Sequence, residues 1–192
     1  DSRSRIWVGG PSVYLMDEGK KQLVPFSDFF DQPGGATMDP GRVFDILEVA
    51  EGHTMIAHHQ GIYHFFEHDR YLHLDTAVMA DNRQRSLFMS TCLALDSLGM
   101  IYIGGVSGVF AYDRLAGTYD FFSNDGSRGL FGRVYSMMVA SDNTLWVGTE
   151  NGLYRYLPVP GRFVAYTVED GLNNDFIYAI EEDNQGMIWV ST

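Results

Sequence analysis

The sequence has one cysteine, only two lysines and no apolar run that approaches the roughly 18 residues of a membrane span. A single cysteine excludes an internal disulfide, and the apolar stretch 87–95 around Cys92 predicts a small buried strand residue. The net charge of −12 disfavours nucleic acid as a partner, because an acidic chain repels phosphate backbones. Nucleophile elbows, Walker loops, dinucleotide fingerprints and zinc-protease motifs are also missing, so the sequence nominates no catalytic residue and no cofactor.

What the sequence does contain is one short unit that recurs along its whole length. The clearest copy is Leu145-Trp146-Val147-Gly148-Thr149, with further copies at 6–10 and 101–105, a weaker one at 55–57 and a last one at 188–192. The Trp-equivalent positions 7, 56, 102, 146 and 189 are 49, 46, 44 and 43 residues apart. Repeats of this length, made of short strands and turns, predict the blades of a β-propeller.

The unit from Val134 to Tyr166 shows the strands of one blade. Strand A is predicted over 134–139, strand B over 144–148, strand C over 153–156 and strand D over 163–166. Asn151 and Gly152 lie in the tight B–C hairpin, where Gly61 and Gly108 occupy matching places. Glycine is expected there because the hairpin needs a residue that tolerates positive φ.

The boundaries of the repeats predict the organisation of the chain. The chain begins and ends in strand B of different blades, so it is predicted to be one all-β segment, 1–192, of four-stranded antiparallel blades. It holds three full blades and two partial ones, at 1–41 (partial), 42–85, 86–132, 133–175 and 176–192 (partial). Because an open propeller would leave sheet edges unpaired, we expect a fragment of a longer propeller of six to eight blades.

Two stretches carry a family resemblance. The unit 134–156 and the stretch 166–189, with Glu169-Asp170-Gly171-Leu172, resemble the two-component regulator propeller repeat. Residues 130–192 match that pattern strongly and 86–112 moderately. Residues 1–75 match weakly, because Ile56 replaces the Trp and His58-His59 stand where Gly-Thr is usual.

The resemblance implies a sensor. Such repeats form the periplasmic region of hybrid two-component histidine kinases of Bacteroides-type bacteria, with two seven-bladed propellers, a β-sandwich, a membrane span and a cytoplasmic kinase. It implies an oligosaccharide ligand, a second propeller and remaining blades as partners, a homodimeric parent and signalling by rearrangement. The membrane span and the kinase would lie outside these residues, so this segment would not itself be an enzyme.

One face of the segment is the predicted ligand site. An up-and-down meander places the D-to-A link and the B–C hairpin of each blade at the same end, around the channel entrance where propellers usually bind ligands. The candidate ligand-binding residues on that face are Arg42, His58, His59, Arg85, Arg133, Asn151, Asn173 and Asn174, with Arg83, Arg128 and Glu150 beside them.

Arginines recur before strand A in three repeats. A ring of guanidinium groups would suit a uronate, a sulfate or an acidic partner loop, because each can pair with such groups bidentately. The offsets from the Trp position are 14 residues for Arg42, 13 for Arg133 and 17 for Arg85. Ordinary solvated or inter-blade arginines therefore remain the alternative to a ring.

All six histidines lie between positions 53 and 73. Imidazole clustering raises a metal hypothesis, but strand alternation predicts His58 and His59 on opposite faces and His53 in the A–B turn. His64 and His68 would be about 13 Å apart along one strand. No metal site is therefore predicted. The Trp7, Tyr102, Trp146 and Trp189 series is likewise interpreted as packing between blades rather than as a sugar-stacking set.

Three functions follow from these patterns. The first is a sensor that binds an oligosaccharide, and the second is a propeller enzyme such as a lyase or a glycosidase. The enzyme predicts a buried acid with a perturbed pKa at the channel mouth. The third is a protein-interaction scaffold, which the acidic composition would fit and which fold alone cannot separate from the others.

Overall fold

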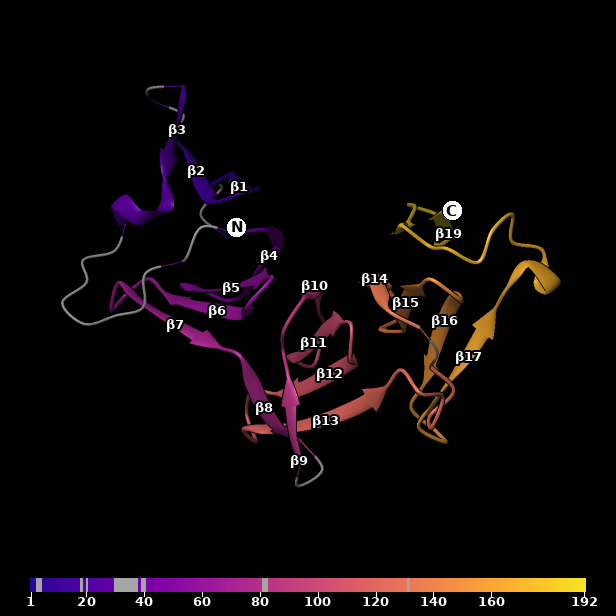
Figure 1. Ribbon diagram of the computed structural model, residues 1–192. Coiled ribbons are helices and arrows are strands. Elements are labelled where there is room, and N and C mark those ends of the chain that lie inside the picture. Colours follow the sequence, from indigo (N-terminus) through magenta and orange to yellow (C-terminus); the bar gives the residue numbers. More distant parts are fainter. Residues whose placement is uncertain are drawn as a thin grey trace. The chain divides into compact units, whose positions relative to one another are not determined.

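The chain folds into antiparallel sheets of two to four strands (Figure 1), as the repeat predicted. The computed structural model describes residues 1–2, 5–17, 19, 21–29, 38, 41–80, 83–130 and 132–192. These residues form two compact units, 1–77 with 86–90 and 78–85 with 91–192. Within the described ranges, neither short helix is long and apolar enough to cross a membrane.

Unit 1 contains a three-stranded and a four-stranded sheet. The first sheet is β1 (Trp7–Gly9), β2 (Val13–Asp17) and β3 (Gln22–Pro25), followed by the 3-10 helix η1 (Phe26–Phe29). The second is β4 (Val43–Ala50), β5 (His53–His58), β6 (Gly61–Phe66) and β7 (Tyr71–Asp75). Their facing side chains form one buried cluster that includes Val13, Leu15, Phe26, Val43, Ile56, Tyr63, Phe65 and Leu72.

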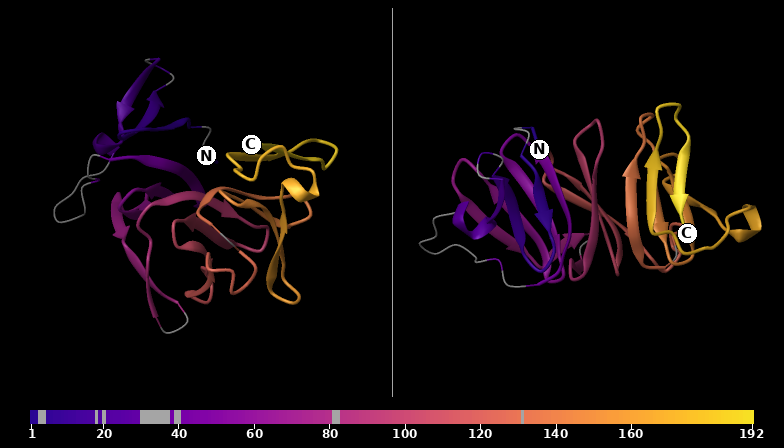
Figure 2. Two further views of the ribbon diagram at one scale, coloured as in Figure 1. Left: turned by 45° about the vertical axis from the view of Figure 1, so that its right-hand side comes forward. Right: turned by 90° about the horizontal axis from the view of Figure 1, so that it is seen from above.

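Unit 2 contains two four-stranded sheets and a two-stranded one. They are β10 (Ser90–Leu95), β11 (Met100–Gly105), β12 (Gly108–Asp113) and β13 (Thr118–Ser123); β14 (Val134–Val139), β15 (Leu145–Thr149), β16 (Gly152–Leu157) and β17 (Arg162–Tyr166); and β18 (Ala179–Glu182) with β19 (Ile188–Ser191). β18 packs on β14 and β15, and β14 packs on β11 (Figure 2). Cys92 lies in the buried cluster of this unit, as predicted.

The fold class is confirmed, with one addition. Three sheets have four strands each in the order of the chain, and the first and last sheets hold three and two strands. A further hairpin, β8 (Ala77–Ala80) with β9 (Arg83–Ser86), follows β7 and was not predicted. The Glu-Asp-Gly-Leu stretch forms the 3-10 helix η2 (Val168–Asp170), capped by Thr167 and ended by Gly171 at φ 106°.

The pairing of β5 with β6 corrects the alignment of the second repeat. Met55 pairs with His64 as Trp146 pairs with Arg155, and the hairpin turns have equal length. Met55, not Ile56, therefore stands at the Trp position. The usual Gly is replaced by Ala57, and His58 takes the place of the following Thr.

The glycine of the repeated unit has a packing role, which we call the blade seam. A Cβ on Gly148 would collide with Ser136 Oγ and lie 2.7 Å from Ile177 Cγ2, at the start of the next blade. Gly104 would meet Val134 Cγ1 at 2.7 Å, and Gly9 would meet Val43 Cγ1 at 2.9 Å. The absence of a Cβ on each glycine leaves space for the aliphatic residue at the start of the next blade, and we call this glycine position the seat.

In the second repeat both members of the seam change together. The seat is Ala57, which is one methyl larger, and the residue at the Val134 position is Ser90. Both are buried, at 0% and 2% exposure. The larger seat thus coincides with a smaller incoming side chain, which keeps the summed volume of the pair close to that of Gly with Val.

In three copies of the unit, the aromatic residue donates a hydrogen bond to an aspartate six positions earlier. Trp7 Nε1 donates to Asp1 at 2.7 Å, and Trp189 Nε1 donates to Asp183 at 2.8 Å. Tyr102 Oη donates to Asp96 at 3.4 Å, and burial raises the pKa of this tyrosine, with Asp96 adding to the effect. Trp7, Tyr102 and Trp146 pack in or on the buried clusters, as interpreted from the sequence, whereas Trp189 on β19 is exposed.

Candidate functional site

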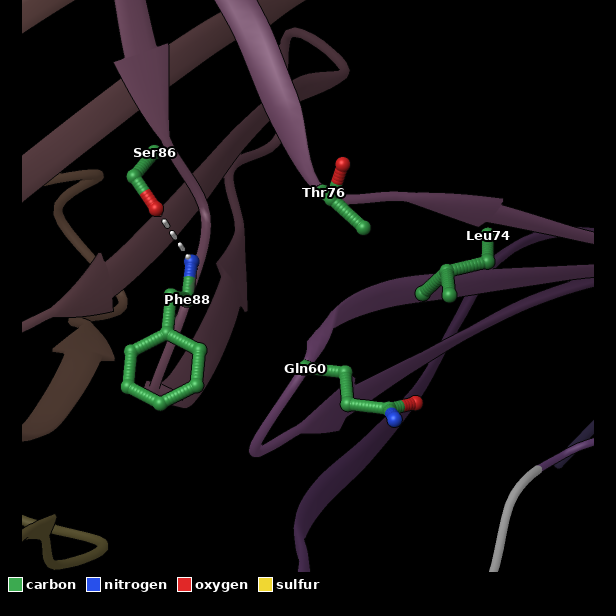
Figure 3. A pocket seen from close by; sticks show the side chains of 5 residues that line it. All are labelled: Gln60, Leu74, Thr76, Ser86 and Phe88. Carbon is green, nitrogen blue, oxygen red and sulfur yellow. Dashed lines mark hydrogen bonds between the residues drawn. The ribbon is translucent and has the colours of Figure 1, made fainter.

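Unit 1 has a pocket on the face predicted to bind ligand (Figure 3). Its volume is about 560 Å³, and its lining residues are Gln60, Leu74, Thr76, Ser86 and Phe88. Gln60 lies in the B–C hairpin, and Thr76, Ser86 and Phe88 lie between strand D of one blade and strand A of the next. In Figure 3, Phe88 and Ser86 lie on one side of the opening, and Gln60 and Leu74 lie on the other.

Local hydrogen bonds shape this pocket. The Leu87 N–H donates to the Thr76 carbonyl at 2.9 Å, which joins the two ends of the β8–β9 hairpin below the pocket. Ser86 Oγ accepts the Phe88 N–H at 3.1 Å, and the buried Tyr63 hydroxyl donates to Gln60 Oε1 at 3.2 Å. The Phe88 side chain remains 52% exposed. The pocket therefore offers an apolar ring, an oriented amide and hydroxyl groups, a set that suits a polyol with an apolar face.

His58 and His59 support the wall of this site. β5 ends at His58, so His59 begins the turn, and the two rings lie together with His58 Nε2 3.3 Å from His59 Nδ1. The prediction of opposite faces was wrong because alternation stops where the strand ends. The Gln60 N–H donates to His58 Nδ1 at 3.3 Å, so His58 Nε2 carries the proton and donates to His59. The His59 backbone joins Arg42 and Met89 by hydrogen bonds of 3.1 and 2.9 Å.

Three of the other four histidines, His53, His64 and His73, form a chain across three strands. His53 Nε2 lies 3.1 Å from His64 Nδ1, His64 Nε2 lies 3.2 Å from Asp75, and His73 Nε2 lies 2.7 Å from the same carboxylate. His53 is the first residue of β5 rather than part of the A–B turn, which corrects its predicted place. In the described part of the chain, no three His, Cys, Asp or Glu side chains converge in a way that could hold a metal ion.

Replacing Asp75 by asparagine is expected to lower the free energy of unfolding by about 1–2 kcal/mol at neutral pH. The hydrogen bond from His64 lowers the pKa of the Asp75 carboxyl against the effect of burial, and His73 lowers it further. A carboxyl group whose pKa is lowered by folding stabilises the fold at pH values above its ordinary pKa near 3.9. This stabilisation is lost as the pH falls through the pKa of the folded state. Urea unfolding at pH 7 and at a series of pH values below 4 would show the difference between the two proteins shrinking. A difference that stays constant with pH would contradict this account.

Arg42 and Arg133 occupy equivalent positions. With Met55 at the Trp position, both lie 13 residues before it, so the difference of one residue in their offsets disappears. The guanidinium of Arg42 lies 5.5 Å from the Phe44 ring, and that of Arg133 lies 5.2 Å from the Tyr135 ring. Each arginine thus stacks on the aromatic residue two positions later in strand A.

Arg85 does not share this position. It lies on β9 of the additional hairpin, and its guanidinium is 4.7 Å from the Phe121 ring of β13. Arg83 lies on the same strand, whereas Arg128 pairs with Asp120 at 2.9 Å. The predicted recurrence of arginines before strand A is therefore restricted to Arg42 and Arg133 as equivalent residues.

The remaining candidates lie around the link that precedes β18. Phe176, at the position equivalent to Arg133, packs against Tyr178 with ring centroids 4.5 Å apart and against Tyr135 at 4.6 Å, both with tilted rings. Asn174 Oδ1 accepts the Phe176 N–H at 3.0 Å, and Asn173 is exposed in the same link. We call Arg133, Tyr135, Phe176 and Tyr178 the collar of unit 2.

The B–C hairpin packs against the collar. The Glu150 N–H donates to the Arg133 carbonyl at 3.3 Å, and the Arg133 N–H donates to Glu150 Oε1 at 3.1 Å. A Cβ on Gly132 would lie 2.7 Å from Asn151 Nδ2, so this hairpin and the link before strand A are in close contact. The meander thus brings these two connections to one end of the blade, as the topology predicted.

Sequence reasoning did not nominate the pocket residues Gln60, Leu74, Thr76, Ser86 and Phe88, nor the collar aromatics. The collar had a readable signal, because Arg42-Val43-Phe44, Arg133-Val134-Tyr135 and Phe176-Ile177-Tyr178 share one pattern. The pocket had none, since it depends on the unpredicted β8–β9 hairpin.

Comparisons with known proteins agree with the repeat and the fold. The model of the family described as two component regulator propeller matches residues 129–151 and 171–192. No curated protein sequence matches the chain. Similar solved structures include the extracellular domains of two hybrid two-component systems from B. thetaiotaomicron. One has a TM-score of 0.72 and 20% identity over 98% of this chain. The other has a TM-score of 0.75 and 18% identity over 97%.

The chain spans about a quarter of those two domains, 24% of each. Virginiamycin B lyase from Staphylococcus aureus, an enzyme, is also similar, with a TM-score of 0.65 and 11% identity over 97% of this chain and 59% of its own. Identities this low show the shared propeller architecture alone. Together with the family match, they identify residues 129–151 and 171–192 as two-component regulator propeller repeats in a β-propeller segment.

Proposed function

We propose that this chain is a ligand-binding segment in the extracytoplasmic sensor region of a hybrid two-component histidine kinase, and that it binds an oligosaccharide. The observation that carries the proposal is the pocket of unit 1, which combines the exposed Phe88 ring with the Gln60 amide and the Thr76 and Ser86 hydroxyl groups. Sugars present apolar ring faces and many hydroxyl groups, so they match such a lining. The family match and the similar extracellular domains support the sensor role.

The signal would arise from differential affinity. A ligand shifts an equilibrium between two arrangements only by the difference in its affinity for them. In the parent protein, these would be two arrangements of its propellers or of a dimer. The periplasmic side of an inner membrane is the place where such a region would meet oligosaccharides.

The shifted carboxyl pKa values bear on the alternative of a glycosidase. A glycosidase requires a general acid with a raised pKa. Five described carboxyl groups have lowered pKa values, because hydrogen bonds to them outweigh the opposing effect of burial, so none of these five has the raised pKa of a general acid. They are Glu48, Asp75, Asp125, Asp142 and Asp183.

Calorimetric titration of the complete extracytoplasmic region against neutral and acidic oligosaccharides tests the proposal. We expect saturable binding without product formation, and a loss of affinity on the order of tenfold for Phe88→Ala, because the ring contact is removed. Tyr71→Ala is the matched control, since Tyr71 is an aromatic residue of unit 1 with similar exposure, 46% against 52%, outside the pocket lining.

Each contrary result has a separate meaning. Product formation in the same samples would replace the sensor by the enzyme. No binding across the panel would leave the interaction scaffold. Equal losses in Phe88→Ala and Tyr71→Ala would show that the pocket is not the site.

A further inference from the structure

The collar of unit 2 holds a positive charge in a fixed place. Arg133 stacks on Tyr135, Tyr135 packs against Phe176, and Phe176 packs against Tyr178, with the aromatic rings tilted to one another. Tyr135 and Phe176 are half-buried, and Tyr178 is 61% exposed. Stacking restricts the long arginine side chain, so a ligand that pairs with it would lose less conformational entropy on binding.

Among the residues that the structure describes, the Arg133 guanidinium has no acidic partner. Arg5 pairs with Asp1 and Glu67 at 2.7 and 2.8 Å, and Arg128 pairs with Asp120 at 2.9 Å. Across the part of the chain that the structure describes, no carboxylate lies within ion-pair distance of the Arg133 guanidinium, and its buried Nε has no hydrogen-bond acceptor.

The same arrangement occurs once more in the chain. Arg42 of unit 1 stands at the equivalent position and stacks on Phe44 at 5.5 Å. Its guanidinium also lacks a carboxylate partner within the described ranges. Two repeats thus present an arginine that stacks on an aromatic residue of strand A and has no acidic partner among the described residues, which suits a binding position for an anion.

We propose that the collar of unit 2 recognises an anionic substituent, a carboxylate or a sulfate, on a sugar of an oligosaccharide ligand. The inference rests on the proposed function and restricts the ligand to acidic saccharides. The planar guanidinium would pair bidentately with the anion. The exposed face of Tyr178 would receive the apolar face of the sugar ring.

A neighbouring carboxylate gives the proposal a second, signed test. Glu150 Oε1 accepts the Arg133 N–H at 3.1 Å, so its negative charge lies beside the collar and opposes an incoming anion. Neutralising it while keeping a hydrogen-bond acceptor, as in Glu150→Gln, should raise the affinity for acidic saccharides. The same change should leave a neutral saccharide unaffected.

The experiment uses the complete extracytoplasmic region and three probes. They are an oligogalacturonate, the same oligosaccharide with its carboxyl groups reduced to alcohols, and a sulfated chondroitin tetrasaccharide. For Arg133→Gln we expect a loss of affinity of about 10- to 100-fold for the acidic probe that binds. Arg155→Gln is the matched control, because Arg155 also stacks on an aromatic ring, 5.8 Å from the Trp146 centroid, but on β16 outside the collar.

The outcomes separate this inference from the proposed function. Tight binding of the neutral oligosaccharide with unchanged affinity in Arg133→Gln would overturn the inference and leave the oligosaccharide sensor in place. Equal losses in Arg133→Gln and Arg155→Gln would also overturn it, and so would weaker acidic binding in Glu150→Gln. If none of the three probes binds and no neutral oligosaccharide of the panel binds, both the inference and the proposed function are wrong. Preference between the carboxylated and the sulfated probe decides which anion the collar takes.

Discussion

Gly148→Ala is expected to lower the free energy of unfolding by about 2–3 kcal/mol, although it adds a single methyl group. The new Cβ would collide with Ser136 Oγ and press on Ile177 Cγ2 at 2.7 Å, so two blades would have to separate. Urea unfolding followed by the fluorescence of Trp146, two residues away, would report the change. Gly10→Ala is the control, because nothing lies within 4 Å of its added Cβ. We expect this variant to stay within about 0.5 kcal/mol of the parent.

The chain itself supplies a compensating change. The second repeat pairs Ala57 with Ser90, so Ile177→Ser in the Gly148→Ala background copies a combination that the fold already contains. Ile177→Ser alone should destabilise through lost apolar burial. The loss of unfolding free energy in the double variant should be at least about 1 kcal/mol smaller than the sum of the losses in the two single variants. Strict additivity would show that the glycine and the aliphatic residue do not act as a pair.

Gly108→Ala is expected to cost about 3 kcal/mol or more, for two reasons that act together. Gly108 has φ 126°, a conformation that L-residues rarely adopt, and its Cβ would collide with the Phe122 carbonyl oxygen of the neighbouring strand. Neither the turn nor the sheet can relax without breaking the ladder between β12 and β13. The measurement is the thermal midpoint of unfolding.

Gly99→Ala isolates the conformational part of that cost. Gly99 also has a positive φ, 88°, but nothing lies within 4 Å of its added Cβ. The variant should lose only about 1–2 kcal/mol, the price of the left-handed backbone alone. If Gly108→Ala and Gly99→Ala lose the same free energy of unfolding, the Phe122 carbonyl shifts to accommodate the new Cβ at no energetic cost, which contradicts the expected collision.

The sequence predicted the blades because their signal is local. Alternating strands, turn residues and the hairpin glycines recur in each copy, and the structure places β14 to β17 within a few residues of the expected ranges. The alignment of the second repeat was wrong by one residue because Met55 and Ile56 are both apolar and either could occupy the buried Trp position. Only the pairing of β5 with β6 distinguishes them.

The candidate site was less predictable because it depends on a fold-back. β8 and β9 have only four residues each, and the sequence between them is Asp-Asn, so this part of the chain had the composition of a link. The return of Phe88 toward Gln60 creates the pocket, and neither residue shows this in its local sequence. Arg42, Arg85 and Arg133 were all nominated because arginines recur before strand A; the structure places Arg42 and Arg133 at equivalent positions and Arg85 on β9.

The blade seam has a consequence for how such chains can recombine. In unit 2 the paired residues of each seam come from successive repeats, Gly104 with Val134 and Gly148 with Ile177. A genetic crossover at a boundary between repeats, such as 132 to 133, would take Gly104 from one parental gene and its seam partner Val134 from the other. A crossover in the A–B turn at 141–143 lies between Val134 and Gly148, so it transfers complete pairs. Gene exchange that preserves folding should therefore concentrate within blades, at their A–B turns, instead of between them.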